Sequence, residues 1–319
     1  MPCAFRKTIP TVRPFKGRTD TIVRMTVNCG KCLYCQSLVK KAWIFRFQQE
    51  ARVTPPETQN MITLTYKDSD FMPIWPQNYD HDNPPKRKSP ALKRAIHAQN
   101  RQKELLYYRD VGAMIKHFRK DGWSKDSCRF FYVGEYGSTT FRPHYHLLTW
   151  GIDPQVVYDY WYARYGQPHI APSVYSRYAY VVNYLDKDEY PEIMKDNPLF
   201  TGKPQGRRMS PGIGSSYLDE MTTGEIDQVL KTGQHFVSLD DGRQLPLPVY
   251  FRNKIYEKFD LPEEIRDRNT ADILTNATQQ ASEQQLEILY KLGLTPKYYQ
   301  IHLMKENERK RKKHKKVRR

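Results

Sequence analysis

The stretch FRPHYHLLTWG, residues 141–151, places two histidines one residue apart inside an otherwise apolar run. Such a run is typical of a β-strand, in which side chains alternate between the two faces. His144 and His146 therefore share one face, and Tyr145 and Leu147 share the other. Two imidazoles on one face can chelate a metal. The alternative is one hydrogen-bonded core histidine beside a chance second one.

The preceding run CRFFYVGEYG, residues 128–137, is also strand-like, and the short link STTFR joins it to the histidine strand. Sequential strands with so short a link usually pair as a hairpin. If the hairpin closes symmetrically, Glu135 lies opposite His144 with its side chain on the same face. We therefore predict Glu135, His144 and His146 as ligands of a divalent cation, Mg²⁺, Mn²⁺ or Zn²⁺, with positions left open for substrate oxygens.

A second candidate group lies in YAYVVNYLDK, residues 178–187, within a helix expected over 176–190. Tyr180 and Tyr184 are four residues apart and Lys187 follows three later, so one helix face would carry all three. A phenol with a pKa near 10 becomes a useful nucleophile when a metal polarises the phosphate or a lysine favours the phenolate. A plain aromatic packing stripe is the alternative.

The spacing of apolar residues in the rest of the chain predicts both helices and strands. Helices are expected over 36–52, 107–123 and 154–166, a strand over 60–66 and an extended piece over 167–173. With the hairpin, these elements predict an α+β fold, a central antiparallel sheet flanked by helices, with an N-terminal cysteine loop and a C-terminal extension.

Composition shifts suggest four parts. They are residues 1–59, a cysteine-containing segment and helix; 60–190, the core; 191–300, an extension; and 301–319, a basic tail expected to be disordered. Within the core, the proline-rich and basic residues 73–102 are expected to form a long surface insertion. The extension should contain a glycine-rich loop at 207–218, two short strands around Asp241 and Gly242, and a helix over 262–294.

The 319 residues carry a formal net charge of +17, with 52 Lys and Arg against 35 Asp and Glu, and include 23 tyrosines. Basic side chains neutralise phosphates and aromatic rings stack on unpaired bases, so this composition favours single-stranded nucleic acid as a partner. The alternative is a generic basic surface. Arg142, Lys86, Arg87 and Lys88 are the candidate DNA-binding residues. No run of eighteen apolar residues and no apolar leader segment occurs, so we expect a cytosolic protein without a membrane partner.

Five cysteines are present, and three of them, Cys29, Cys32 and Cys35, lie in CGKCLYC. An odd count in a cytosolic chain argues against a disulfide framework. Two overlapping C-x-x-C pairs can converge thiolates on one zinc ion, with the remote Cys3 as the candidate fourth ligand. Reduced cysteines without a metal are the alternative.

Taken in order, MITLTY, HYH and YVVNYLDK resemble the HUH endonucleases that initiate rolling-circle replication. The chain resembles most closely the replication initiation proteins of small single-stranded DNA phages, in the gokushovirus branch of the Microviridae. That resemblance rests on CGKCLYC, GEYGSTTFRPHYHLLTWG, YVVNYLDK, MSPGIG and LPVYFRNKIY, and its blocks run from about Cys3 to Tyr256.

The resemblance implies metal-binding roles for His144 and His146, nucleophile roles for Tyr180 and Tyr184, and an assisting role for Lys187. Glu135 matches the place of a carboxylate ligand that varies among these initiators. The implied activity is nicking of origin DNA, with a 5′-phosphotyrosine and a free 3′-hydroxyl as products.

Without a G-x-x-x-x-G-K-[ST] phosphate loop, the chain is expected to use a host helicase and DNA polymerase in the cytoplasm of a bacterial host. A plasmid relaxase, a tyrosine transposase and a non-enzymatic single-stranded DNA-binding or packaging protein are the alternatives.

Overall fold

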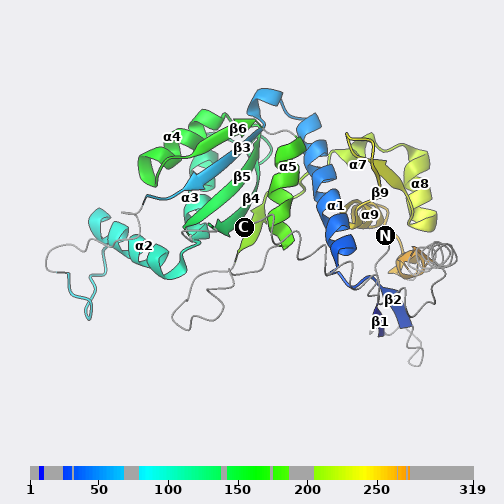
Figure 1. The fold of residues 1–319 in the computed structure, drawn as a ribbon, viewed down its shortest axis with the longest axis horizontal. Helices are drawn as coiled ribbons and strands as arrows, with labels where there is room; N and C mark the ends of the chain where they lie inside the picture. The colour runs from blue at the N-terminus through cyan, green and yellow to red at the C-terminus, as the bar shows by residue number, and fades with distance from the viewer. Residues whose placement is uncertain are drawn as a thin grey trace, which may run out of the picture. The chain divides into compact units, whose positions relative to one another are not determined.

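Five antiparallel strands form the central sheet of the protein, whose structure is a computed structural model (Figure 1). The strands lie in the order β6-β3-β5-β4-β7. Their bounds are β3 Asn60–Thr65, β4 Arg129–Tyr136, β5 Pro143–Trp150, β6 His169–Pro172 and β7 Gly206–Met209. The predicted α+β class, with a central antiparallel sheet and flanking helices, is confirmed.

The structure describes residues 7–10, 24–30, 32–67, 79–137, 142–172, 175–186, 205–263, 265–270 and 272–273. The chain divides into a sheet unit, residues 46–214, and a terminal unit, residues 1–45 with 215–319. Helix α1 (Leu33–Arg52) begins in the terminal unit and ends in the sheet unit. The domain boundaries after residues 59, 190 and 300 stay predictions.

The other helical elements in the described part of the sheet unit are η1 Pro56–Thr58, α2 Pro90–Glu104, α3 Tyr108–Lys120, α4 Pro154–Arg164, α5 Tyr175–Val182 and η3 Asn183–Asp186. The predicted helices at 36–52, 107–123 and 154–166 correspond to α1, α3 and α4. None of the described helices is both long enough and apolar enough to cross a membrane.

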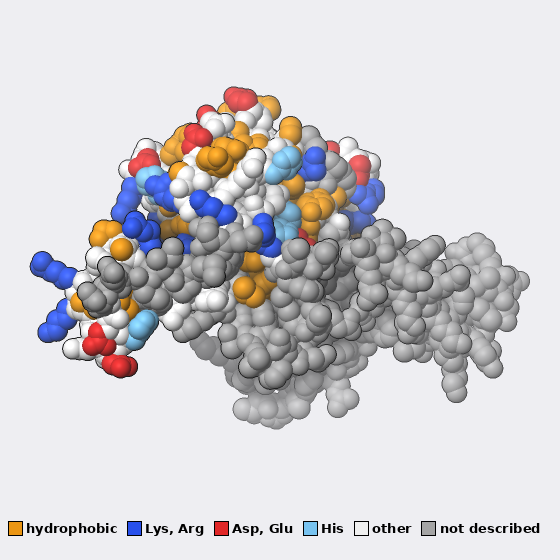
Figure 2. Space-filling model, turned by 60° about the vertical axis from the view of Figure 1, so that its left-hand side comes forward, with side chains coloured by type: hydrophobic (Ala, Val, Ile, Leu, Met, Phe, Trp, Pro, Cys, Tyr) orange, Lys and Arg blue, Asp and Glu red, His pale blue; other side chains and the backbone are white. Residues whose placement is uncertain are grey.

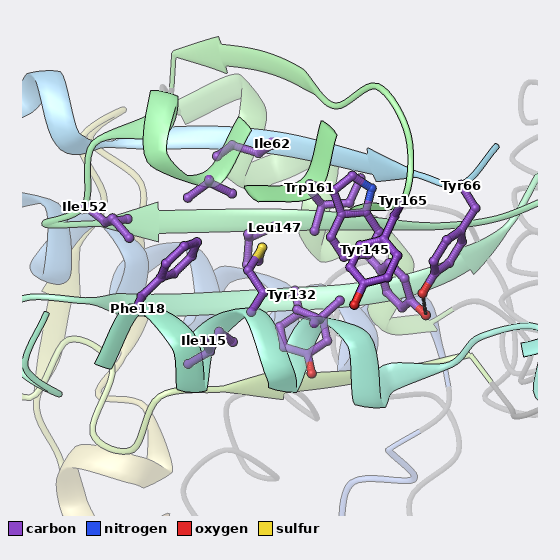
Figure 3. Close-up of a cluster of buried hydrophobic side chains, with 14 of the residues drawn as sticks. Ile62, Tyr66, Ile115, Phe118, Tyr132, Tyr145, Leu147, Ile152, Trp161 and Tyr165 are labelled. Atoms are coloured by element: carbon purple, nitrogen blue, oxygen red, sulfur yellow. Dashed lines mark hydrogen bonds between the residues drawn. The ribbon is translucent and has the colours of Figure 1, made fainter. Parts of the chain in front are cut away.

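One face of the sheet packs on α3 and α4. Alternation along β5 turns Tyr145 and Leu147 to this face, where both are buried. Ile115 and Phe118 of α3 and Trp161 of α4 belong to the same cluster (Figure 3). This cluster is the apolar face that the alternation in FRPHYHLLTWG predicts.

The opposite face is covered by α5 and by the last turns of α1. The Phe47 ring of α1 lies 4.8 Å from the Phe131 ring of β4, 5.6 Å from the Trp150 ring of β5 and 5.6 Å from the Tyr178 ring of α5. These aromatic contacts hold α5, the helix that carries the candidate nucleophile Tyr180, against the histidine face of the sheet.

Residues 73–102, predicted as a long surface loop, are not a loop in their second half, which forms helix α2 Pro90–Glu104. The Ser89 hydroxyl accepts a hydrogen bond from the Leu92 backbone N–H, and Pro90 occupies the first turn, as helix starts prefer. Leu92 and Ala95 are buried, so α2 has an apolar face that the many basic residues obscure in the sequence. Residues 68–78 lie outside the described part.

The glycine-rich loop predicted at 207–218 is also partly wrong, because residues 207–209 belong to edge strand β7. This strand pairs with β4 through Phe131 and Met209, and it is too short and too basic to show an alternating pattern. Residues 211–216 do form turns. Gly214 has φ +72°, and a Cβ there would collide with the backbone carbonyl of Arg46, so this glycine permits close packing on α1.

The helix predicted over 176–190 is α-helical only from Tyr175 to Val182 and continues as the 3-10 turn η3 to Asp186. A 3-10 turn is a common way for an α-helix to end. Residues 187–190 lie outside the described part.

Within its described residues, the terminal unit contains two small antiparallel ribbons and several helices. Its strands are β1 Lys7–Pro10, β2 Arg24–Val27, β8 Phe236–Ser238 and β9 Gln244–Pro246, and its helices besides the start of α1 are α7 Tyr217–Glu220, α8 Thr223–Thr232 and α9 Val249–Lys258. The predicted strands around Asp241 and Gly242 are confirmed as β8 and β9. Of the helix expected over 262–294, residues 263, 265–270 and 272–273 are described and helical.

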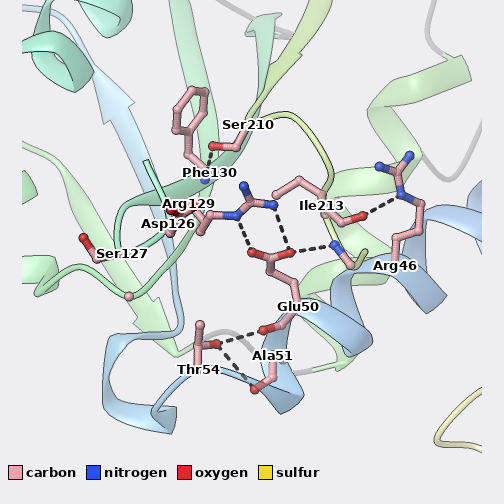
Figure 4. Close-up of polar contacts among 12 residues, drawn as sticks. Arg46, Glu50, Ala51, Thr54, Asp126, Ser127, Arg129, Phe130, Ser210 and Ile213 are labelled. Carbon is pink, nitrogen blue, oxygen red and sulfur yellow. Dashed lines mark hydrogen bonds and ion pairs between the residues drawn. The ribbon is translucent and has the colours of Figure 1, made fainter. Parts of the chain in front are cut away.

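A buried ion pair joins α1 to the sheet within the sheet unit (Figure 4). Glu50 accepts hydrogen bonds from Arg129 Nε at 2.6 Å and Nη2 at 3.3 Å, and from the Gly214 backbone N–H at 2.6 Å. Both partners of the ion pair are largely buried, with side-chain exposures of 14% for Arg129 and 7% for Glu50. Removing one partner of such a pair leaves a buried charge uncompensated.

We expect Glu50→Gln to lower the free energy of unfolding by roughly 3 kcal/mol, because Arg129 loses its buried counter-charge. The matched control is Glu57→Gln, at an exposed position, which should change stability by less than about 0.5 kcal/mol. Equilibrium urea unfolding measures both variants. Equal stabilities of the two would contradict a structural role for the Glu50 network.

Candidate functional site

The strand register brings the predicted metal ligands together. In the β4–β5 hairpin Glu135 pairs with His144, as symmetric closure of the link predicts. Glu135 Oε2 lies 3.1 Å from His144 Nε2 and 2.9 Å from His146 Nε2. The ligand atoms of all three residues lie within 4.8 Å of one another, and the group could hold a metal ion.

The second nitrogen of each imidazole also has a hydrogen-bond partner. His144 Nδ1 lies 3.1 Å from the Arg142 carbonyl oxygen, and His146 Nδ1 lies 3.2 Å from Thr63 Oγ1. Since a carbonyl can only accept, His144 Nδ1 carries a proton, and in the neutral ring Nε2 then presents a lone pair. A lone pair 3.1 Å from a carboxylate oxygen is repulsive unless a proton or a cation lies between them.

The donor set therefore fits a divalent cation. Two imidazole nitrogens and one carboxylate oxygen suit Mn²⁺ or Zn²⁺, and three protein ligands leave positions for substrate oxygens. Glu135 and His146 are buried, at 7% and 3% exposure, while His144 is half-buried at the rim. Burial on one side and access on the other is the arrangement that an open catalytic metal site needs.

Thr63 is a contact of the site that the sequence reasoning did not identify. It lies on β3, directly opposite His146 in the β3–β5 pairing. The sequence offered one signal for Thr63, a polar residue within the strand MITLTY. Directly opposed residues of paired strands share a face, so this polar residue could lie on the histidine face. Its hydroxyl fixes the His146 ring in the way that outer-shell partners orient metal-binding histidines.

Both candidate nucleophiles lie against the histidine face. The Tyr184 ring of η3 stacks on the His146 ring, with centroids 4.6 Å apart and an interplanar angle of 23°. The Tyr180 ring of α5 meets the same imidazole edge-on at 5.2 Å. The Tyr184 hydroxyl donates a hydrogen bond of 2.5 Å to the Tyr180 hydroxyl.

The two phenols differ in their surroundings. Tyr180 is 42% exposed, whereas Tyr184 is half-buried. Burial raises the pKa of Tyr184 above its ordinary value, and the hydrogen bond with Tyr180 and the charge of Glu135 act in the same direction. Tyr184 is therefore a neutral phenol at neutral pH, and a positive charge beside Glu135 would offset the effect of the carboxylate.

The remaining predicted site residues are spread along the chain. Arg142 is exposed, two residues before His144, and Lys86, Arg87 and Lys88 are exposed ahead of α2. Lys187 and Cys3 lie outside the described residues. Figure 2 shows Lys and Arg side chains at several separate places on the described part of one face, with His side chains among them. Cys29, Cys32 and Cys35 form a separate cluster that could also hold a metal ion.

The site thus combines a carboxylate and two imidazoles on one face of an antiparallel sheet with two phenols from α5 and η3 that lie against that face. Residues 59–189 match the family described as REP_ORF2-G2P, Replication-associated protein ORF2/G2P. This range contains Glu135, both histidines and both tyrosines of the site.

One relative points to the same class, the replication-associated proteins. The chain is 24% identical over 251 residues to Replication-associated protein ORF2 of Spiroplasma virus 4, an alignment that covers 73% of this chain and 69% of that protein. No solved structure is significantly similar to the chain. The family match and this relative together support a viral replication protein.

We expect Glu135→Gln to weaken Mn²⁺ binding at least about tenfold, because the amide replaces the only charged ligand of the group. The loss of free Mn²⁺ signal in electron paramagnetic resonance titrations measures the affinity. Glu57→Gln, the same change at an exposed position, is the control and should bind as the unmodified protein does. Unaltered affinity in Glu135→Gln would remove Glu135 from the metal site.

Proposed function

We propose that this protein is a replication initiator that nicks origin DNA by tyrosine attack and stays covalently joined to the 5′ end. The observation that carries the proposal is the packing of Tyr180 and Tyr184 on His146, beside the Glu135 carboxylate. A nucleophile pair and a cation-binding group on one face are the parts that a phosphodiester transesterification needs.

In the proposed reaction the phenolic oxygen of one tyrosine attacks the phosphorus of the scissile phosphodiester. The bond from phosphorus to the 3′ oxygen breaks, and the phenolic proton is exchanged for the one that the departing 3′ oxygen takes up. The products are a 5′-phosphotyrosine and a free 3′-hydroxyl that can prime synthesis. A divalent cation held by Glu135, His144 and His146 would stabilise negative charge on the non-bridging oxygens.

Two tyrosines allow the reaction to run twice. The first phosphotyrosine conserves the energy of the broken phosphodiester, so a 3′-hydroxyl can later attack it and reseal the strand. The second tyrosine, one hydrogen bond away, can cut the displaced strand after a round of synthesis. Because Tyr180 is the more exposed phenol, we propose it as the first nucleophile.

Several finer assignments belong to the same proposal. They are membership of the HUH superfamily and of the gokushovirus-like initiators, Mg²⁺ or Mn²⁺ as the cation, and an assisting role for Lys187. The proposed partners are single-stranded and origin DNA with a host helicase and polymerase, in the cytoplasm of a bacterial host. The sequence resemblance supports them, together with the replication-associated family match.

Covalent capture of labelled single-stranded origin DNA tests the proposal directly. We expect a DNA adduct that resists denaturing electrophoresis, requires a divalent cation and maps to Tyr180 or Tyr184 by mass spectrometry. DNA binding without any adduct would instead favour a non-enzymatic single-stranded DNA-binding protein.

We expect Tyr180→Phe to slow the first cleavage more than Tyr184→Phe, and the double variant to lose at least about a thousandfold in nicking rate because no nucleophile remains. Single-turnover nicking of origin DNA measures the rates. Tyr162→Phe, at an exposed tyrosine of α4, is the matched control and should nick normally. Undiminished nicking by the double variant would refute tyrosine attack at this site.

Replacing Lys86, Arg87 and Lys88 together by Gln should lower the salt dependence of DNA binding. Each phosphate contact contributes about 0.7 to the slope of log affinity against log salt on single strands, so the slope should fall by about 2. Fluorescence anisotropy over a salt series measures it. A control of equal charge change replaces the exposed Lys116, Lys120 and Lys125, and the same loss in both would indicate general charge rather than a contact by residues 86–88.

A further inference from the structure

Three cysteines converge where β2 leads into α1. Cys35 Sγ lies 3.4 Å from Cys32 Sγ and 3.9 Å from Cys29 Sγ. All three sulfurs lie within 4.8 Å of one another. Four sulfurs arranged tetrahedrally at about 2.3 Å from one zinc ion are about 3.8 Å apart. The observed spacings are therefore close to the edges of a zinc tetrahedron.

The backbone between the first two cysteines is shaped to bring them together. Gly30 has φ +73°, a left-handed conformation that favours glycine, and it makes the tight turn in the sequence CGKC. After this turn the Cys32 backbone N–H donates to Cys29 Sγ at 3.3 Å. A backbone N–H directed at sulfur stabilises a thiolate, which is the form that binds metal.

The start of α1 adds to this effect. Cys32 immediately precedes the helix and Cys35 lies in its first turn. The positive end of a helix macrodipole favours the deprotonated thiol. By contrast, burial raises the pKa of the isolated Cys128 to about 11. The three sulfurs thus have the spacing of a ligand set, whereas Cys128 lies outside the cluster.

We propose that Cys29, Cys32 and Cys35 bind a structural zinc ion. Thiolates are soft ligands that select Zn²⁺ over Mg²⁺ or Mn²⁺, the cations proposed for the Glu135 group. The three cysteines lie outside residues 59–189, the range of the replication-associated family match. The inference is therefore independent of the proposed nicking function.

We propose Cys3 as the fourth ligand. In the β1–β2 ribbon Lys7 pairs with Val27, so the chain before Lys7 and the chain after Val27 leave from the same end. Cys3 precedes Lys7 by four residues, and Cys29 follows Val27 by two. Ligation by Cys3 would close this end of the ribbon and tie it to the start of α1.

Substitution with Co²⁺ tests the site in the intact chain. Cobalt bound by thiolates gives an intense sulfur-to-metal charge-transfer band, which a site of imidazole and carboxylate ligands does not produce. We expect this band in the unmodified protein and its displacement by Zn²⁺. We also expect the protein purified under reducing conditions to contain one tightly bound zinc per chain, measured by mass spectrometry of the metal.

The variants identify the ligands. Cys35→Ser should lose the charge-transfer band and the bound zinc, whereas Cys128→Ser, a change at a buried cysteine outside the cluster, should keep both. Cys3→Ser should keep a weaker band with reduced zinc affinity if Cys3 is the fourth ligand, and an unchanged band and affinity would refute that role.

The unmodified protein gives a result even if a variant fails to fold. Absence of the thiolate band, or absence of bound zinc in the protein purified under reducing conditions, would overturn the zinc proposal. Neither result would bear on the proposed nicking function, because the thiolate band does not report on the Glu135 group.

Discussion

The register of the β4–β5 hairpin is the constraint on which the site depends. Because side chains alternate with a period of two, a slip of one residue would turn His144 and His146 into the apolar core. The same slip would expose Tyr145 and Leu147, which are buried against α3 and α4. Core packing on one face therefore holds the ligand geometry on the other.

The tyrosines depend on packing in a similar way. Tyr178 is buried, and its ring lies near both Phe47 and Trp150 on the histidine face of the sheet. Val181 and Val182 of the same helix are also buried, so apolar side chains hold α5 on the sheet. With the helix held there, the Tyr180 and Tyr184 rings lie against His146.

The proposed zinc cluster would be stabilised differently from the Glu135 group. The Glu135 group combines a hard carboxylate with two imidazole donors on a sheet that apolar packing already makes rigid. The cysteine cluster lies in a short connection between a two-stranded ribbon and a helix. A metal ion can supply cohesion there that small ribbons lack on their own.

Sequence alone determined the alternating strands, the hairpin, the placement of Glu135 opposite His144 and the main amphipathic helices, because strand and helix periodicity are local properties. It did not reveal helix α2, whose apolar face is hidden among basic residues, or edge strand β7, which has no alternating pattern. Tertiary structure decided that Tyr184 lies in a 3-10 turn stacked on His146 and that Thr63 orients that ring. These features join residues from separate elements, so the local pattern carries no signal for them until packing brings the elements together.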